Sequence, residues 1–169
     1  MSRHPQARQQ SGMALAISLI LLFVLTIIGV SAMQSTTMEE RMTGNLASRS
    51  TAFQRAEGTL SEAKDYLAAP VNMSNFTAGG ANGLYAFGAS PDYQASGTWS
   101  AATTRSSASQ PDSRWYATVE TDQPVVEPGR NCVPGPSCPL GQVFGVVARS
   151  TDDSGKAVVI LRARYWKQY

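Results

Sequence analysis

The most pronounced hydrophobic pattern in the chain is an uncharged run near its N-terminus. Residues 13–33 read MALAISLILLFVLTIIGVSAM and contain no Asp, Glu, Lys or Arg. As a helix this run would be about 31 Å long at ~1.5 Å per residue, which is close to the ~30 Å hydrocarbon core of a bilayer. The pattern therefore predicts a transmembrane helix over residues 13–33.

The charges on either side of this run indicate its orientation. Arg3 and Arg8 precede it, whereas Glu39 and Glu40 are the first charged residues after it. Because cytoplasmic flanks carry an excess of Lys and Arg, the N-terminus is expected in the cytoplasm. The rest of the chain is then extracytoplasmic, in a compartment that permits disulfide bonds.

From residue 34 to residue 69 the pattern becomes that of an amphipathic helix. Apolar residues recur at spacings of three, four or seven: Met38, Met42, Leu46, Phe53, Ala56, Leu60, Ala63 and Leu67. Charged residues between them predict a solvated face: Glu39, Arg41, Arg49, Arg55, Glu62 and Lys64. Gly44 weakens the helix and is a predicted bend, and Pro70 is expected to end it.

Residues 70–169 are expected to form a C-terminal head. Residues 71–113 are rich in Ser, Thr, Asn, Gly and Ala, which favours irregular surface loops, with a specific binding surface as the alternative. Three strand-like runs follow, at 114–121, 142–150 and 156–166.

The motif TDDSG, at residues 151–155, joins the last two strand-like runs. Its Asp and Gly residues suit a tight hairpin turn. A calcium loop is the alternative, but the regular spacing of acidic ligands that such a loop uses is missing. We therefore expect an α+β fold in which the long helix packs its apolar stripe on a small antiparallel sheet.

Composition and motifs argue against several functional classes. The net charge is +2 with both signs thinly spread, which is unlike the basic face of a nucleic-acid-binding protein. The single histidine, His4, precedes the apolar run, so the usual histidine-dependent triads and metal sites are not expected. No phosphate-binding glycine motif is present either. We expect a protein that is not an enzyme, with no catalytic residues, no cofactor and no bound metal.

The two cysteines lie in a loop rich in Pro and Gly. Cys132 and Cys138 are separated by five residues in NCVPGPSCP. This segment lacks the CxxC spacing and the His partners of a zinc site. A small disulfide loop is the better interpretation.

Three fates are open for the N-terminal segment. It could be a secretory signal cleaved after the small-x-small triplet that ends at Ala32, although the apolar run is longer than a usual signal core. It could be an uncleaved membrane anchor. Alternatively, the charged tip alone could be removed after Gly12, which would leave the apolar helix in the product.

The third possibility is supported by a resemblance. QQSG followed by MALAISLILLFVLTIIG resembles the class III leader of type IV prepilins, and the first 65 residues or so resemble the PilX family of minor pilins. The segments MEERMTGN and AFQRAE are particularly similar. The resemblance implies cleavage after Gly12, N-methylation of Met13 and use of the helix in a filament. The chain would then comprise a leader (1–12), a transmembrane helix (13–33), its amphipathic continuation (34–69) and a head (70–169).

The sequence departs from the usual pilin pattern at one position. Most pilins carry Glu at the fifth residue after cleavage, whereas this chain has Ile17. A major, shaft-forming pilin is therefore a poor fit. A minor pilin that initiates or caps a type IV pilus, near its tip, fits better. A pseudopilin of a type II secretion system is the alternative, and a membrane-anchored periplasmic binding module is an alternative of another class.

The resemblance also implies where the protein resides and what it meets. The location would be the inner membrane, with a periplasmic C-terminal domain, followed by the pilus. The implied partners are other minor pilins, the major pilin, a PilY-type tip adhesin, the prepilin peptidase and the inner-membrane assembly platform. Direct binding of nucleic acid is not expected.

Overall fold

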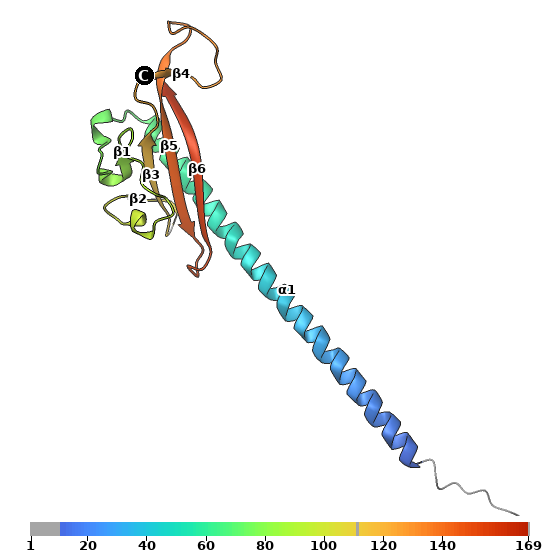
Figure 1. The fold of residues 1–169 in the computed structure, drawn as a ribbon. Helices are drawn as coiled ribbons and strands as arrows, with labels where there is room; N and C mark the ends of the chain where they lie inside the picture. The colour runs from blue at the N-terminus through green and yellow to red at the C-terminus, as the bar shows by residue number, and fades with distance from the viewer. Residues whose placement is uncertain (1–10, 111, 169) are drawn as a thin grey trace, which may run out of the picture. The chain divides into compact units, whose positions relative to one another are not determined.

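The structure, a computed structural model, describes residues 11–110 and 112–168. Arg3, His4, Arg8 and most of the expected leader lie outside the described residues. The chain forms two units, which divide between Asn45 and Leu46. Its elements in chain order are the helix α1 (Ser11–Ala68), the 3-10 helices η1 (Met73–Asn75), η2 (Ala81–Gly83) and η3 (Ser96–Trp99), and the strands β1 (Leu84–Tyr85), β2 (Arg105–Ser106), β3 (Arg114–Val119), β4 (Val125–Val126), β5 (Leu140–Thr151) and β6 (Val158–Gln168) (Figure 1).

In the first unit, the described residues belong to the N-terminal part of α1. Their side chains, from Gly12 to Asn45, are all exposed. The apolar run lies here, and α1 is the one helix among the described residues that is long and apolar enough to cross a membrane. The predicted helix over 13–33 is confirmed, and α1 continues through Gly44 without a break in its helical assignment.

The second unit is built on a sheet of six strands. β3 and β6 lie on opposite edges of β5, since both pair with Phe144 of that strand. β1 and β2 pair with the outer edge of β3, and β4 pairs with one end of β5 (Figure 1). The three predicted strands are confirmed as β3, β5 and β6. The expectation of a wholly antiparallel sheet is wrong in one respect, because β1 runs parallel to β3.

The C-terminal part of α1 covers one face of this sheet. Its contact residues are small where the helix lies closest, with Ala52, Ala56 and Ala63 fully buried. Ala63 belongs to a cluster that we call the helix-side core: Ala63, Leu67, Phe76, Leu84, Trp115, Ala117, Val119, Phe144, Val146 and Ala148. The predicted packing of helix on sheet is confirmed for this part of the stripe.

The N-terminal part of the predicted stripe does not pack on the sheet in this way. Met38, Met42 and Leu46 are more than 60% exposed, and Phe53 is 43% exposed. The expectation that the whole stripe needs cover from the sheet was therefore wrong. The physical reason is that helical periodicity records which residues share a face, but it does not record how far a sheet extends along that face.

The opposite face of the sheet is covered by the segment that was expected to form irregular loops. We call this packing the outer cluster: Tyr85, Tyr116 and Val147, with Ala89, Tyr93, Trp99 and Ile160 against them. The ring of Tyr116 contacts those of Tyr85 and Trp99, with centroids 5.5 and 5.7 Å away. Burial raises the pKa of Tyr116 to about 12. The segment is irregular in backbone, as predicted, yet its scattered aromatic residues form a second layer of core.

The ends of the elements follow local sequence signals. α1 ends at Ala68, two residues before Pro70, as the proline predicted. The motif TDDSG does join β5 to β6, but it is longer than a tight turn. The last paired residues are Thr151 and Val158, which leaves a six-residue loop, residues 152–157, whose ends are joined by a bond from the N–H of Asp152 to the carbonyl of Ala157.

Candidate assembly site

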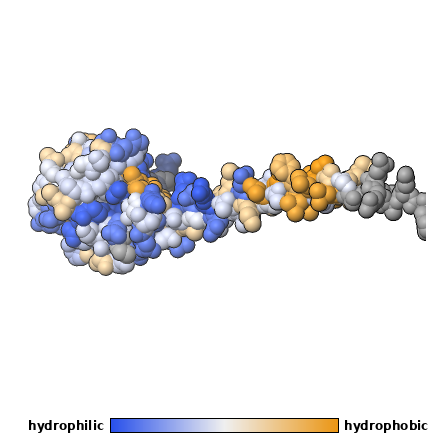
Figure 2. All heavy atoms as spheres, turned by 90° about the horizontal axis from the view of Figure 1, so that it is seen from below, coloured by the Kyte–Doolittle hydropathy of each residue, from blue (hydrophilic) through white to orange (hydrophobic). Residues whose placement is uncertain are grey.

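The first candidate site is the uncovered part of α1. Figure 2 shows apolar side chains gathered along this part of the helix, whereas the head surface is mostly hydrophilic. Met13 is 70% exposed and Ile17 is 54% exposed. Large aliphatic and aromatic side chains continue the exposure through residue 33: Leu15, Leu19, Ile20, Leu21, Leu22, Phe23, Val24, Leu25, Ile27, Ile28, Val30 and Met33. An apolar surface of this extent marks a site that contacts lipid or protein.

Two of the hydroxyls within this segment are satisfied by the helix itself. The Ser18 hydroxyl donates to the carbonyl of Leu15 at 2.9 Å, and the Thr26 hydroxyl donates to the carbonyl of Phe23 at 2.7 Å. Hydroxyls bonded in this way leave no unmet donor on the helix surface. These two hydroxyls can therefore enter an apolar environment without the cost of a bare polar group.

Gly12 and Met13 lie in the first turn of the described helix. A side chain added at Gly12 would meet no atom within 4 Å. The fold of the single chain thus gives no steric reason for glycine at this position. A glycine in a helix costs roughly 0.5–1 kcal/mol relative to Ala, so the choice of residue calls for an explanation outside the folded chain.

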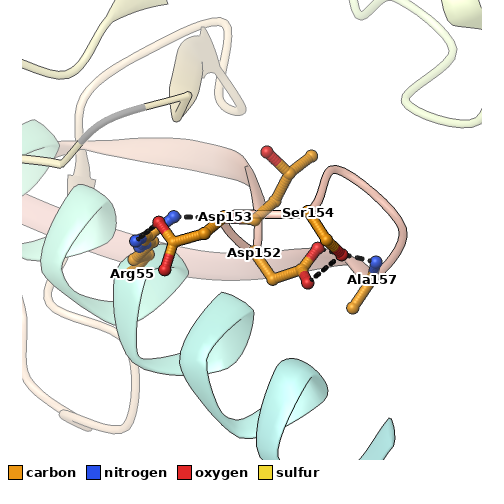
Figure 3. Close-up of polar contacts among 6 residues, drawn as sticks. Arg55, Asp152, Asp153, Ser154 and Ala157 are labelled. Atoms are coloured by element: carbon orange, nitrogen blue, oxygen red, sulfur yellow. Dashed lines mark hydrogen bonds and ion pairs between the residues drawn. The ribbon is translucent and has the colours of Figure 1, made fainter.

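A polar contact joins the C-terminal part of α1 to the head (Figure 3). Arg55 donates to the carboxylate of Asp153 at 2.5 Å and to the backbone carbonyl of Thr151 at 3.0 Å. Arg55 was predicted to lie on a solvated face, but its side chain is only 14% exposed. This contact ties the C-terminal part of α1 to the hairpin loop between β5 and β6.

The same loop is held by Asp152. The carboxylate of Asp152 accepts bonds from the Ser154 hydroxyl at 2.5 Å and from the backbone N–H of Ala157 at 2.9 Å (Figure 3). These bonds lower the pKa of Asp152 to about 2, the bond from Ser154 contributing most. Both neighbouring carboxylates thus have partners within the protein, which fits a structural turn better than the calcium loop considered from the sequence.

A second contact joins α1 to the segment before β3. The Glu62 carboxylate accepts bonds from the hydroxyl of Ser107 at 2.6 Å and from the backbone N–H of Ala108 at 3.0 Å. The backbone N–H and the hydroxyl of Ser109 also donate to it. Burial acts to raise the pKa of Glu62, but these hydrogen bonds outweigh it and leave the pKa below its ordinary value. Glu62, like Arg55, was expected to be merely solvated. Its partner sequence SAS, at residues 107–109, carries no periodic signal that could have revealed the contact.

Cys132 and Cys138 form a disulfide, with their Cα atoms 6.1 Å apart. The bond closes a small loop within the connection from β4 to β5. The backbone groups of Gly135 and Cys138 exchange two hydrogen bonds inside that loop. Cys138 is buried and Cys132 is exposed. The structure thus brings the predicted pair together, in the second unit, while Gly12, Met13 and Ile17 all lie on α1 in the first.

The described residues contain no cluster of three or more His, Cys, Asp or Glu side chains that could hold a metal ion. The exposed apolar side chains described above offer a surface for association. It consists of an uncovered apolar helix and a head with two packed faces and a small disulfide loop.

Comparison with known families gives a match that covers most of α1. Residues 11–60 match the family described as PilX N-terminal. No curated protein and no solved structure shows significant similarity to the chain. The matched range begins one residue before Gly12 and includes both the uncovered apolar helix and the start of its packed part. The resemblance to the PilX family of type IV pilus minor pilins, first noted from the residues, is therefore confirmed over this N-terminal segment.

Proposed function

We propose that this chain is a minor pilin that takes part in initiating or capping assembly of a type IV pilus. The observation that carries the proposal is the coincidence of the PilX N-terminal match with an apolar helix that the chain itself leaves uncovered. Such a helix serves first as an inner-membrane anchor and later as part of a filament core, because lipid chains and neighbouring helices are both apolar surroundings. The role is structural and involves no catalysis.

Processing after Gly12 forms part of the proposal. Removal of residues 1–12 and N-methylation of Met13 would leave a mature chain that begins with the apolar run. The position of Gly12 directly before the uncharged run supports this role, because a cut there leaves the whole apolar helix in the product. The proposed partners are the prepilin peptidase, the assembly platform, other minor pilins, the major pilin and a PilY-type tip adhesin.

Ile17 supports a position near the tip. In the usual pilin arrangement, a Glu at this position meets the N-terminal amine of a neighbour, which is mostly protonated at neutral pH because its pKa is about 8. Inside an apolar filament core an unpaired charge costs several kcal/mol, so the two groups must satisfy each other. Ile17 cannot neutralise the amine of a subunit already in place above it. Its own Met13 amine can still meet the Glu of the next subunit added below, which suits a subunit placed first.

A pseudopilin of a type II secretion system is the second candidate. The same observation at Ile17 favours it, because a tip subunit of a secretion pseudopilus would also be placed first. The genes beside this one would distinguish the two, since each apparatus encodes its own major subunit and platform.

The tip position is tested by locating the protein on sheared pili. Epitope-tagged wild type and Ile17→Glu are compared by immunogold labelling, with equal expression verified in the membrane fraction. Label at pilus ends is expected for the wild type, and label along the shafts for the variant. Abundant label along wild-type shafts would refute the tip position, and unchanged label in Ile17→Glu would remove Ile17 as its cause.

A further inference from the structure

Among residues 11–110 and 112–168, one edge of the sheet has no partner strand. β6 pairs with β5 over its whole length, from Val158 to Gln168. In the part of the chain that the structure describes, no strand pairs with the opposite edge of β6. An unpaired edge presents a row of backbone donors and acceptors, which is a template for adding a strand. β6 contains neither Pro nor Gly, the residues that most often interrupt such an edge.

On its helix side, β6 borders an apolar hollow. α1 crosses the sheet over β3 and β5 and leaves part of β6 uncovered, so that Ala163 is exposed and Leu161 is half-buried. A hollow of about 430 Å³ lies between helix and strand, and its lining includes Leu60, Ala163 and Tyr165. Apolar side chains from an added strand would enter this hollow, because neighbouring strands place their side chains on shared faces.

On its outer side, β6 borders a larger hollow of different character. This hollow has a volume of about 580 Å³, and Arg162 and Arg164 lie on its β6 side. Arg164 pairs with Glu120 at 2.6 Å, which neutralises one charge. The guanidinium of Arg162 lies 5.0 Å from the ring centre of Tyr93 and is exposed, so the hollow retains a net positive charge. A strand added here would favour carboxylates on this face.

Together these features specify the occupant. We propose that the free edge of β6 binds an extended segment of another protein in which apolar and acidic residues alternate. The apolar positions would fill the hollow beside Ala163, and the acidic positions would lie beside Arg162 and Arg164. The two hollows share Ala163 and Arg164 in their linings, so one added strand would contact both.

A second copy of this chain fits the edge less well. In a symmetric antiparallel pair of two β6 strands centred on Ala163, Arg162 of one copy would lie opposite Arg164 of the other. Like charges directly opposite each other destabilise such a pair. The charge pattern therefore favours an acidic partner strand over self-association. This inference does not rest on the proposed function, because it uses only the geometry of the head.

The experiment uses the full chain in lipid nanodiscs and three capped, fluorescent peptides. VEVEVEV carries the proposed pattern, VKVKVKV reverses its charge, and VEPEVEV removes one backbone donor from the acidic peptide while keeping its three carboxylates. Fluorescence anisotropy measures binding, and hydrogen–deuterium exchange locates it. We expect VEVEVEV to bind more tightly than either control and to slow exchange in β6.

Charge variants then test whether peptide binding depends on the charge of Arg162. Arg162→Glu should weaken binding of VEVEVEV by about five- to tenfold and favour VKVKVKV, since one attractive cross-strand pair becomes repulsive. Arg162→Gln, a milder change that keeps the side chain polar, should lose the preference without reversing it. Lys156→Glu makes the same charge change in the hairpin loop and should leave both affinities unchanged.

Three results would overturn the proposal. The first is the absence of any preference for VEVEVEV over VKVKVKV in the wild type, including the absence of binding by both. The second is slowed exchange that lies outside β6. The third is protection of β6 that grows with protein concentration and without peptide, which would identify a second copy as the occupant.

Discussion

The uncovered and covered parts of α1 differ in the size of the apolar side chains that they expose and bury. In most folded helices the large apolar side chains are the buried ones. In the covered part, the fully buried positions include Ala52, Ala56 and Ala63. In the uncovered part, the exposed positions are occupied mostly by Leu, Ile, Phe and Val. The fully buried positions of the covered part are thus mostly small, with Leu67 as the exception, whereas large apolar residues are exposed in the uncovered part (Figure 2).

This difference indicates what each part was selected for. Alanine brings the helix backbone close to the sheet, and the contacts of Arg55 and Glu62 then fix it to the head. The large exposed side chains add nothing to the packing of the head. They would be costly in water and are explained by an apolar environment that the single chain does not supply. The comparison therefore separates folding, in the second unit, from the anchoring and assembly that we propose for the first.

The largest effect is expected from Gly12→Leu, which tests the assembly side of the comparison. If the peptidase must fit the residue before the cut, a large side chain should abolish cleavage and keep the protein out of pili. Intact-mass analysis of membrane-extracted protein measures this directly. The wild type should begin at Met13, whereas Gly12→Leu should retain its leader.

Gly29→Leu is the matched control for this substitution. Gly29 lies in the same helix, and an added side chain there would also meet nothing within 4 Å. It should therefore leave cleavage intact. A mature wild-type chain that starts at Met1 or Met33 would contradict processing at Gly12, as would normal cleavage of Gly12→Leu.

The next largest effect is expected from Leu67→Ala, on the folding side. Leu67 is fully buried in the helix-side core, so its truncation should lower the free energy of unfolding of the head by about 2–5 kcal/mol. Leu22→Ala makes the same chemical change at a side chain that is 65% exposed, and it should leave the unfolding of the head unchanged. Urea titration followed by tryptophan fluorescence reports on the head, because the three tryptophans all lie in the second unit. Equal losses in the two variants would show that the halves are not independent in stability.

A smaller effect is expected from removal of the disulfide. Closing the loop between Cys132 and Cys138 restricts the unfolded chain by about 2–2.5 kcal/mol in the entropic model, less any strain. Cys132→Ser combined with Cys138→Ala should lower the stability of the head by up to this amount and leave membrane insertion unaffected. Urea titrations with and without reductant give the measurement. A wild type whose midpoint does not respond to reductant, although both thiols become alkylated, would contradict a stabilising role.

The features that sequence could predict are those with a period or a strong local signal. The uncharged run over 13–33 predicted the apolar helix, Pro70 predicted its end, and the strand-like runs at 142–150 and 156–166 predicted the two long strands. Contacts between segments far apart in sequence left no such trace. Arg55 and Glu62 looked solvated because a charged residue carries the same periodic signal whether it meets water or a loop.

The segment 71–113 also forms long-range contacts that local sequence did not predict. Its polar composition correctly predicted an irregular backbone, but the aromatic residues that form the outer cluster are spaced without regularity. Whether Tyr85 and Trp99 pack on Tyr116 depends on how the loop folds back over β3, which local sequence does not encode. The parallel pairing of β1 was missed for a related reason, since a two-residue strand is too short to show alternation.

The smallest effect is expected at Glu62 and takes the form of a pH dependence. Its pKa in the folded protein lies below the ordinary value of 4.5, so the stability that it contributes is present above about pH 4.5 and is lost as the pH falls through the lowered pKa. Glu62→Gln should destabilise the head by about 1 kcal/mol at pH 7, a modest figure because the carboxylate is only half-buried. The difference from the wild type should shrink as the pH falls below 4.5, because the protonated carboxyl then resembles the amide.

Glu57→Gln, at an exposed position of the same helix, is the control and should not change stability at either pH. Thermal unfolding at pH 7 and pH 3 provides the test, and an equal loss in Glu62→Gln at both values would show that the contact with residues 107–109 does not depend on the charge of Glu62.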